Sequence, residues 1–243
     1  MGYYLNSAQV LSLYKSEVDS PYFVDKSLLL KELFPLVKSG NKHICITRPR
    51  RFGKSVMVAM VGAFFSKGID SGCIFDSLKI AQASESGSTV ESTVGERFDY
   101  REYMNQYNVI YINFIEAANE SSSYQEFISS IKELLQEDLR EAFPEVRFRK
   151  KGTVIQDLRM IYEKNRSRFI LVFDEWDCIF HKSYISNEDR KFAYIFLKFA
   201  ETIFCKPYGN DKAMHWTGFS RRAVGNGPDT WLVHGNEELV VRV

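Results

Sequence analysis

Three short, mostly apolar segments constrain the fold of this chain more than any other feature of its sequence. They cover residues 43–47, 109–114 and 169–173, and each is typical of a short buried strand. The segments around them carry apolar residues at helical spacing, over 26–37, 56–65, 123–143, 154–162 and, after a capping Asn187, 192–203. Strands with continuous apolar character are covered on both faces, as in a parallel sheet. The sequence therefore predicts an α/β fold in which helices cover both faces of a parallel sheet.

The first apolar run leads into a glycine, a lysine and a serine at the point where a helix should begin. A phosphate site needs a helix N-terminus, exposed backbone N–H groups and a cation that reaches the β and γ oxygens. Gly53 lets the backbone come close, Lys54 supplies the charge, and Ser55 offers a hydroxyl to Mg²⁺. We assign phosphate binding to the whole loop, which consists of Arg48, Pro49, Arg50, Arg51, Phe52, Gly53, Lys54 and Ser55.

This loop departs from the G-x-x-x-x-G-K-[ST] pattern at its first position, where Arg48 replaces glycine. A residue with a Cβ atom restricts φ, so we expect the loop to curve differently from an ordinary Walker A loop. Arg50 and Arg51 either add positive charge toward the phosphates or form an exposed basic turn. A lone Gly-Lys-Ser is also compatible with a simple helix start, so the assignment needs a second motif.

The third apolar run supplies that motif, because it ends in Asp174 and Glu175. In P-loop proteins a carboxylate at the end of a neighbouring strand holds Mg²⁺, and a catalytic residue orients the attacking water. An acidic turn at a strand end is the alternative interpretation. Two such motifs, each at the end of a buried strand, favour a nucleotide site in which Ser55 and Asp174 are the metal ligands and Glu175 and Lys54 the catalytic residues.

Composition limits the other classes of function. The net charge of +1 gives no global indication of nucleic acid or of an acidic membrane, so a polyanion site must be local. The four cysteines form no C-x-x-C pair, which argues against a zinc site and fits a reducing compartment. We see no signal peptide and no apolar run of about 18 residues, and we therefore expect a soluble, cytoplasmic protein with no membrane partner.

Two other segments each allow two interpretations. The basic residues 147–151 are read as a solvated face rather than a nucleic-acid patch, because no companion stretch of basic and aromatic residues accompanies them. Residues 22–26 could pack beneath an adenine ring, but ordinary core is the preferred interpretation.

Three motifs together resemble the bacterial AAA-ATPase-like family: YFVDK at residues 22–26, TRPRRFGKS at 47–55 and DEWD at 174–177. The resemblance extends over about residues 20–208, and an arginine at position 48 is the family's own pattern. It implies an ATP-binding P-loop domain of the additional-strand class that uses ATP and Mg²⁺. Many members carry a PD-(D/E)XK nuclease-like domain C-terminal to it.

The resemblance also implies a further strand, located between the strand that ends at Asp174 and the strand that precedes the phosphate loop. Members show it as an apolar run that ends in Thr-Gly, and no such run follows residue 208, where 209–214 is polar and 224–229 is rich in Gly and Pro. We therefore expect the central fourth strand to be missing or scrambled, and 209–243 to come from a shifted reading frame or a truncation. A sheet without its middle strand should aggregate and have weak ATPase activity at best.

These observations divide the chain into a helical segment (1–40) that packs on the core, a P-loop ATPase-like core (41–208) and an atypical tail (209–243). The predicted function is Mg²⁺-dependent ATP binding with hydrolysis. The alternative is a nucleotide-binding switch or interaction module that hydrolyses little and normally regulates an attached nuclease-like domain, which we do not expect here. A protein partner is expected but not identified, nucleic acid is not indicated, and no arginine finger can be assigned.

Overall fold

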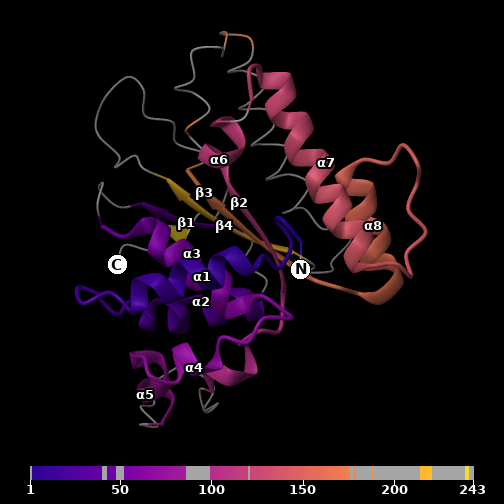
Figure 1. Cartoon of the computed structure of the whole chain (residues 1–243). Coiled ribbons are helices and arrows are strands. Elements are labelled where there is room, and N and C mark those ends of the chain that lie inside the picture. The colour runs from indigo at the N-terminus through magenta and orange to yellow at the C-terminus, as the bar shows by residue number, and fades with distance from the viewer. Residues whose placement is uncertain are drawn as a thin grey trace.

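A computed structural model of the chain describes residues 2–39, 43–47, 52–85, 99–119, 121–175, 178, 186, 188, 214–220 and 239–240. Within them helices and strands alternate (Figure 1). The helices are α1 (Ala8–Val18), α2 (Leu28–Ser39), α3 (Lys54–Phe65), α4 (Gly72–Phe75), α5 (Lys79–Glu85), the 3-10 helix η1 (Tyr100–Glu102), α6 (Phe114–Asn119), α7 (Tyr124–Ala142) and α8 (Val154–Asn165). The strands are β1 (His43–Thr47), β2 (Asn108–Asn113), β3 (Phe169–Asp174), β4 (Met214–Ser220) and β5 (Leu239–Val240).

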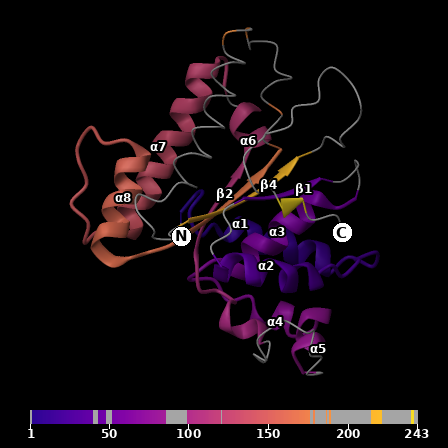
Figure 2. The same cartoon turned by 180° about the vertical axis from the view of Figure 1, so that it is seen from behind.

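The five strands form one parallel sheet in the order β2-β3-β4-β1-β5. Alternate residues of β2 and β3 enter two separate hydrophobic clusters, one on each face of the sheet. Val109 and Val172 belong to the cluster that contains side chains of α1 to α5, whereas Ile110 and Leu171 belong to the cluster of α6, α7 and α8. Figures 1 and 2 show α7 and α8 on one side of the sheet and α1, α2 and α3 on the other. The predicted parallel sheet with helices on both faces is therefore confirmed.

Side chains cap the starts of two of the predicted helices, α7 and α8. Ser123 caps α7 by accepting a hydrogen bond from the backbone N–H of Glu126, and Thr153 forms a full capping box with Gln156 at the start of α8. The helix after the phosphate loop begins at Lys54, two residues earlier than predicted, and is buried over nearly its whole length. The predicted helix after Asn187 lies outside the described residues.

The expectation that the central strand is missing is wrong. Residues Met214–Ser220 form β4, which pairs with β3 on one side and with β1 on the other. The prediction required a continuous apolar run, but a strand between two others is held by backbone hydrogen bonds on both edges. Trp216, Thr217 and Phe219 also belong to residue types that are enriched in strands. The expected aggregation rested on the missing strand and loses its basis, while the shifted reading frame stays a prediction for the coding sequence to test.

The edge of the sheet at β2 is covered by the N-terminal segment. Leu5 forms an antiparallel bridge with Ile110, and the backbone N–H of Tyr111 donates to the carbonyl of Tyr4 at 2.9 Å. The α1 and α2 helices that follow pack into the same hydrophobic cluster as α3. The division of the chain into three parts stays a prediction. Among the described helices, none has the length and apolarity that a membrane crossing requires.

Candidate functional site

The turn before α3 has the backbone geometry that a phosphate loop needs at its last glycine. Gly53 has φ 73° and ψ 35°, in the left-handed region where a side chain is strained, and its carbonyl accepts the N–H of Met57 at 3.0 Å as the helix begins. Gly53 has no side chain to cap the first turn, so the positive end of the helix dipole is left to a ligand. Of the predicted loop, Phe52, Gly53, Lys54 and Ser55 are described, whereas Arg48, Pro49, Arg50 and Arg51 lie outside the described residues.

Lys54 and Ser55 occupy the first turn of α3 and differ in exposure. Lys54 is only 7% exposed, and Ser55 is exposed. The following residues, from Met57 to Phe65, are all buried, and all but Gly62 belong to the hydrophobic cluster on one face of the sheet, which fixes the direction of the helix. Because α3 is held in this way, the positions of Lys54 and Ser55 follow from the packing of the helix rather than from the loop alone.

The two predicted acidic residues lie at the end of β3, where the sequence placed them. Asp174 is the last residue of the strand and is 2% exposed, and Glu175 follows it at 7% exposed. Glu175 has φ 55°, an unusual value for a residue with a side chain. Its carbonyl accepts the N–H of Cys178 at 3.0 Å, so the chain turns sharply after the strand. The next residues of the motif, Trp176 and Asp177, lie outside the described residues.

Strand register brings the two motifs to one edge of the sheet. Thr47, the last residue of β1, is paired with Ser220 of β4, and Asp174 is paired with Phe219, the preceding residue of the same strand. The ends of β1 and β3 are therefore level to within one residue. They are separated by two strand spacings, about 10 Å. Asp174 and Glu175 thus lie at the edge of the sheet where β1 also ends.

Two polar residues near this edge were not singled out in the sequence. Asn113, the last residue of β2, is paired with Asp174, and its side-chain oxygen Oδ1 accepts a hydrogen bond from the backbone N–H of Ile115 at 3.0 Å. Burial, and then the negative charges of Asp174 and Glu116, raise the pKa of Tyr111 above its ordinary range. The available signal was Asn113 near the end of the second apolar run, as Asp174 directly follows the third.

Lys26 is a third residue that the sequence analysis did not assign to the site. Its Nζ donates a hydrogen bond to the carbonyl oxygen of Phe52 at 2.5 Å, directly before Gly53. The preferred interpretation of residues 22–26 as ordinary core holds only for part of them. Phe23 packs against the core cluster, whereas Tyr22 is 90% exposed and Val24 is 66% exposed. Lys26 itself is half-buried.

The chemistry of the donor set suits Mg²⁺. Ser55 offers a hydroxyl oxygen and Asp174 a carboxylate oxygen, and Mg²⁺ is commonly bound through one or two carboxylates together with waters and substrate phosphates. No cluster of three or more His, Cys, Asp or Glu side chains suited to a metal ion occurs in the part of the chain that the structure describes.

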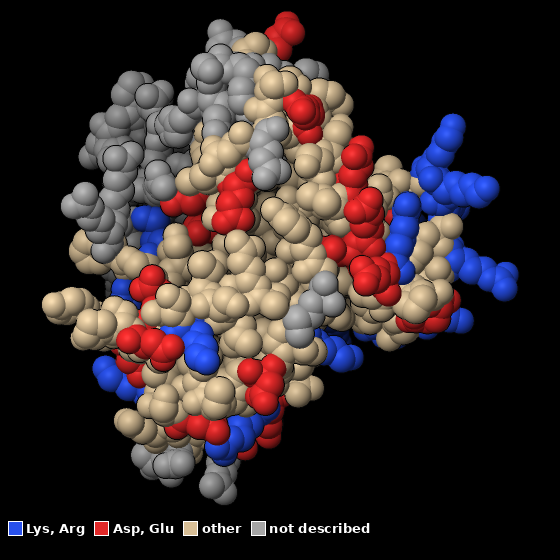
Figure 3. Space-filling model, in the orientation of Figure 1, with Lys and Arg blue, Asp and Glu red and all other residues tan. Residues whose placement is uncertain are grey.

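The basic residues 147–151 form an outward turn between α7 and α8. Arg147, Arg149, Lys150 and Lys151 are exposed, and only Phe148 packs against the core. Figure 3 shows the blue side chains of this region extending away from the molecule. This geometry agrees with a solvated face.

Comparison with known proteins adds the family. The chain matches the model of a family described as "Predicted AAA-ATPase" over residues 13–208. No curated protein and no solved structure matches the chain. The match covers most of the chain, including the phosphate loop, the start of α3 and the end of β3. With these motifs at one edge of a parallel sheet, the chain belongs to the AAA-ATPase-like family.

Proposed function

We propose that this protein binds ATP with Mg²⁺ at the N-terminus of α3 and hydrolyses it. The observation that carries the proposal is the edge of the sheet where Gly53 and Lys54 open α3 and where, across β4, Asp174 and Glu175 end β3. The strand order adds support, because one strand separates the two motif-bearing strands, as the additional-strand class of P-loop proteins requires. Family membership adds ATP as the expected nucleotide.

Each residue has a distinct role in this proposal. Lys54 contacts the β and γ phosphate oxygens, and the N–H groups at the start of α3 face the same anion. Ser55 and Asp174 would hold Mg²⁺, which neutralises charge on the phosphate oxygens when it is bound. Glu175 accepts a proton from the attacking water. It follows Asp174 in the chain and begins the turn after β3. From the composition we expect a cytoplasmic location, and we also expect a protein partner.

Calorimetric titration of the protein and of its Lys54→Ala variant with Mg·ATP tests the proposal. One charge-assisted contact to phosphate contributes about 1.5–3 kcal/mol, so we expect at least about tenfold weaker binding. Lys67→Ala is the matched control, because Lys67 is an exposed lysine just beyond the other end of α3. Circular dichroism checks that both variants keep the fold. Equal affinity in all three proteins would remove the phosphate role of Lys54.

A further inference from the structure

The segment before α2 places a lysine directly against the proposed phosphate loop. Lys26 Nζ lies 2.5 Å from the carbonyl oxygen of Phe52, although 26 residues separate the two positions along the chain. A Cβ atom built on Gly53 would lie 3.2 Å from the same Nζ, so Lys26 contacts the loop at the residue that opens α3. Neither the phosphate motif nor the family match assigns a role to this lysine.

The backbone around Lys26 is fixed by its two neighbours. Asp25 accepts the N–H of Ser27 through one carboxylate oxygen at 2.8 Å and the N–H of Lys79 through the other at 2.7 Å. The hydroxyl of Ser27, which is fully buried, accepts the N–H of Ile80 at 3.1 Å. Both residues thus attach the segment to the N-terminus of α5. Because its backbone is attached on either side, Lys26 reaches the loop from a defined position.

The contact with Phe52 determines the orientation of a backbone N–H. A peptide unit is planar, and in the trans form its C=O and N–H point in opposite directions. No cis peptide bond occurs in the described residues. An ammonium group that holds the carbonyl of Phe52 on the Lys26 side therefore directs the N–H of Gly53 to the opposite side. An anion site needs N–H groups that converge on the ligand and carbonyls that point away from it.

We propose that Lys26 is a positioning residue of the nucleotide site, which holds the Phe52 carbonyl so that the Gly53 N–H faces the polyphosphate of a nucleoside triphosphate. This inference rests on the proposed function of α3. The ammonium group of Lys26 also adds positive potential at a loop that receives a polyanion. The ligand contact is made by the loop, and Lys26 acts through it.

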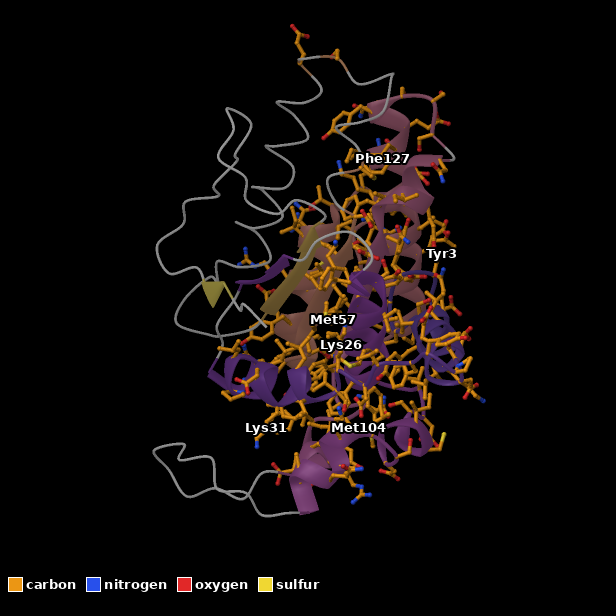
Figure 4. All side chains as sticks on the ribbon, turned by 90° about the vertical axis from the view of Figure 1, so that its left-hand side faces the viewer. Tyr3, Lys26, Lys31, Met57, Met104 and Phe127 are labelled. Atoms are coloured by element: carbon orange, nitrogen blue, oxygen red, sulfur yellow. The ribbon has the colours of Figure 1, made fainter. Side chains whose placement is uncertain are left out.

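The test compares Lys26→Met with Lys26→Arg and with the control Lys31→Met, which removes a lysine about one turn into α2 (Figure 4). Each protein is titrated with Mg·ATP and with Mg·tripolyphosphate, and its thermal midpoint is measured. We expect Lys26→Met to weaken both ligands by about tenfold, which is the effect of one charge-assisted hydrogen bond. The thermal midpoint should stay unchanged, because the lost contact is exposed. Lys26→Arg should recover most of the affinity, since a guanidinium can donate to the same carbonyl.

Hydrogen exchange at residues 52–57 without ligand provides a second measurement. We expect faster exchange there in Lys26→Met and parental exchange in Lys31→Met. Unchanged affinity for both ligands in Lys26→Met, alongside weak binding by Lys54→Ala, would overturn the role of Lys26 and leave the proposed function standing. If the parent protein binds neither ligand, the proposed function fails, and the role of Lys26 fails with it.

Discussion

At the scale of single residues, the proposed site contains two unusual backbone conformations. Gly53 and Glu175 both have positive φ, at the start of α3 and at the end of β3. Glycine adopts this region without strain, whereas for Glu175 it costs roughly 1–2 kcal/mol. Strain of this kind persists where the surrounding structure imposes it, and it is concentrated at functional sites. The conformation of Glu175 is therefore a reason, independent of the motif, to test its carboxylate.

We expect Glu175→Gln to keep Mg·ATP binding and to lose most turnover. An amide cannot accept the proton from water, and loss of a general base reduces rates by about 10²–10⁴-fold. Phosphate release at saturating ATP measures the turnover, and calorimetry measures the binding. Glu116→Gln is the control, because Glu116 is an exposed carboxylate in α6, just after β2. Turnover at the parental rate in Glu175→Gln would favour the alternative function, a nucleotide-binding switch or interaction module.

At the scale of elements, one carboxylate on α7 holds the N-terminal segment at the edge of the sheet. Asp138 accepts the backbone N–H groups of Tyr3, Tyr4 and Leu5 at 2.8, 2.6 and 2.9 Å. Asp138 is buried, and the same segment forms the antiparallel bridge to β2. The carboxylate thus connects α7 to the N-terminal segment that covers the edge strand β2. Without this segment, β2 would expose unpaired backbone groups.

Replacement of this carboxylate by an amide should release the N-terminal segment. In Asp138→Asn one acceptor oxygen becomes an NH₂ donor that faces backbone N–H groups, and we expect the free energy of unfolding to fall by about 2–3 kcal/mol. Urea denaturation measures the loss, and hydrogen exchange at residues 3–5 should become faster. Glu137→Gln changes an exposed carboxylate on the same helix and should alter stability by less than about 0.5 kcal/mol. Equal stability of the two variants would mean that Asp138 does not hold the segment.

At the scale of the whole molecule, the sheet depends on a strand from beyond the family match. The match ends at residue 208, whereas β4 covers Met214–Ser220 and lies between β1 and β3. Both strands of the proposed nucleotide site therefore share a neighbour that comes from the region predicted to be an atypical tail. Without β4, the backbone groups along the facing edges of β1 and β3 would lose their partners.

We expect a chain that ends at residue 208 to aggregate and to lose cooperative unfolding, because it exposes two unpaired strand edges. A chain that ends at residue 222 keeps β4 and, among the strands that the structure describes, loses only the short β5, so it should unfold cooperatively. Size-exclusion chromatography and thermal denaturation of the two chains measure the difference. A soluble, cooperatively melting chain of residues 1–208 would show that β4 is not needed at the centre of the sheet.

The elements that the sequence determined by itself are those with a local cause. Apolar runs predicted β1, β2 and β3, and apolar residues at helical spacing predicted helices such as α7, because both depend on residues that are close along the chain. The placement of Gly53, Lys54, Asp174 and Glu175 at strand ends and a helix start has the same origin. Their roles in binding and hydrolysis remain predictions.

Only the tertiary structure decided the features that join distant segments. Strand β4 lacks a continuous apolar run, and its place in the sheet comes from backbone pairing with β1 and β3, more than 35 residues away. The contact of Lys26 with Phe52 likewise depends on Asp25 and Ser27, which bind α5. Hydrogen bonds between segments far apart in the chain produce no periodic pattern in the sequence. The tertiary fold determines which groups pair, and the residues next to them in the chain do not.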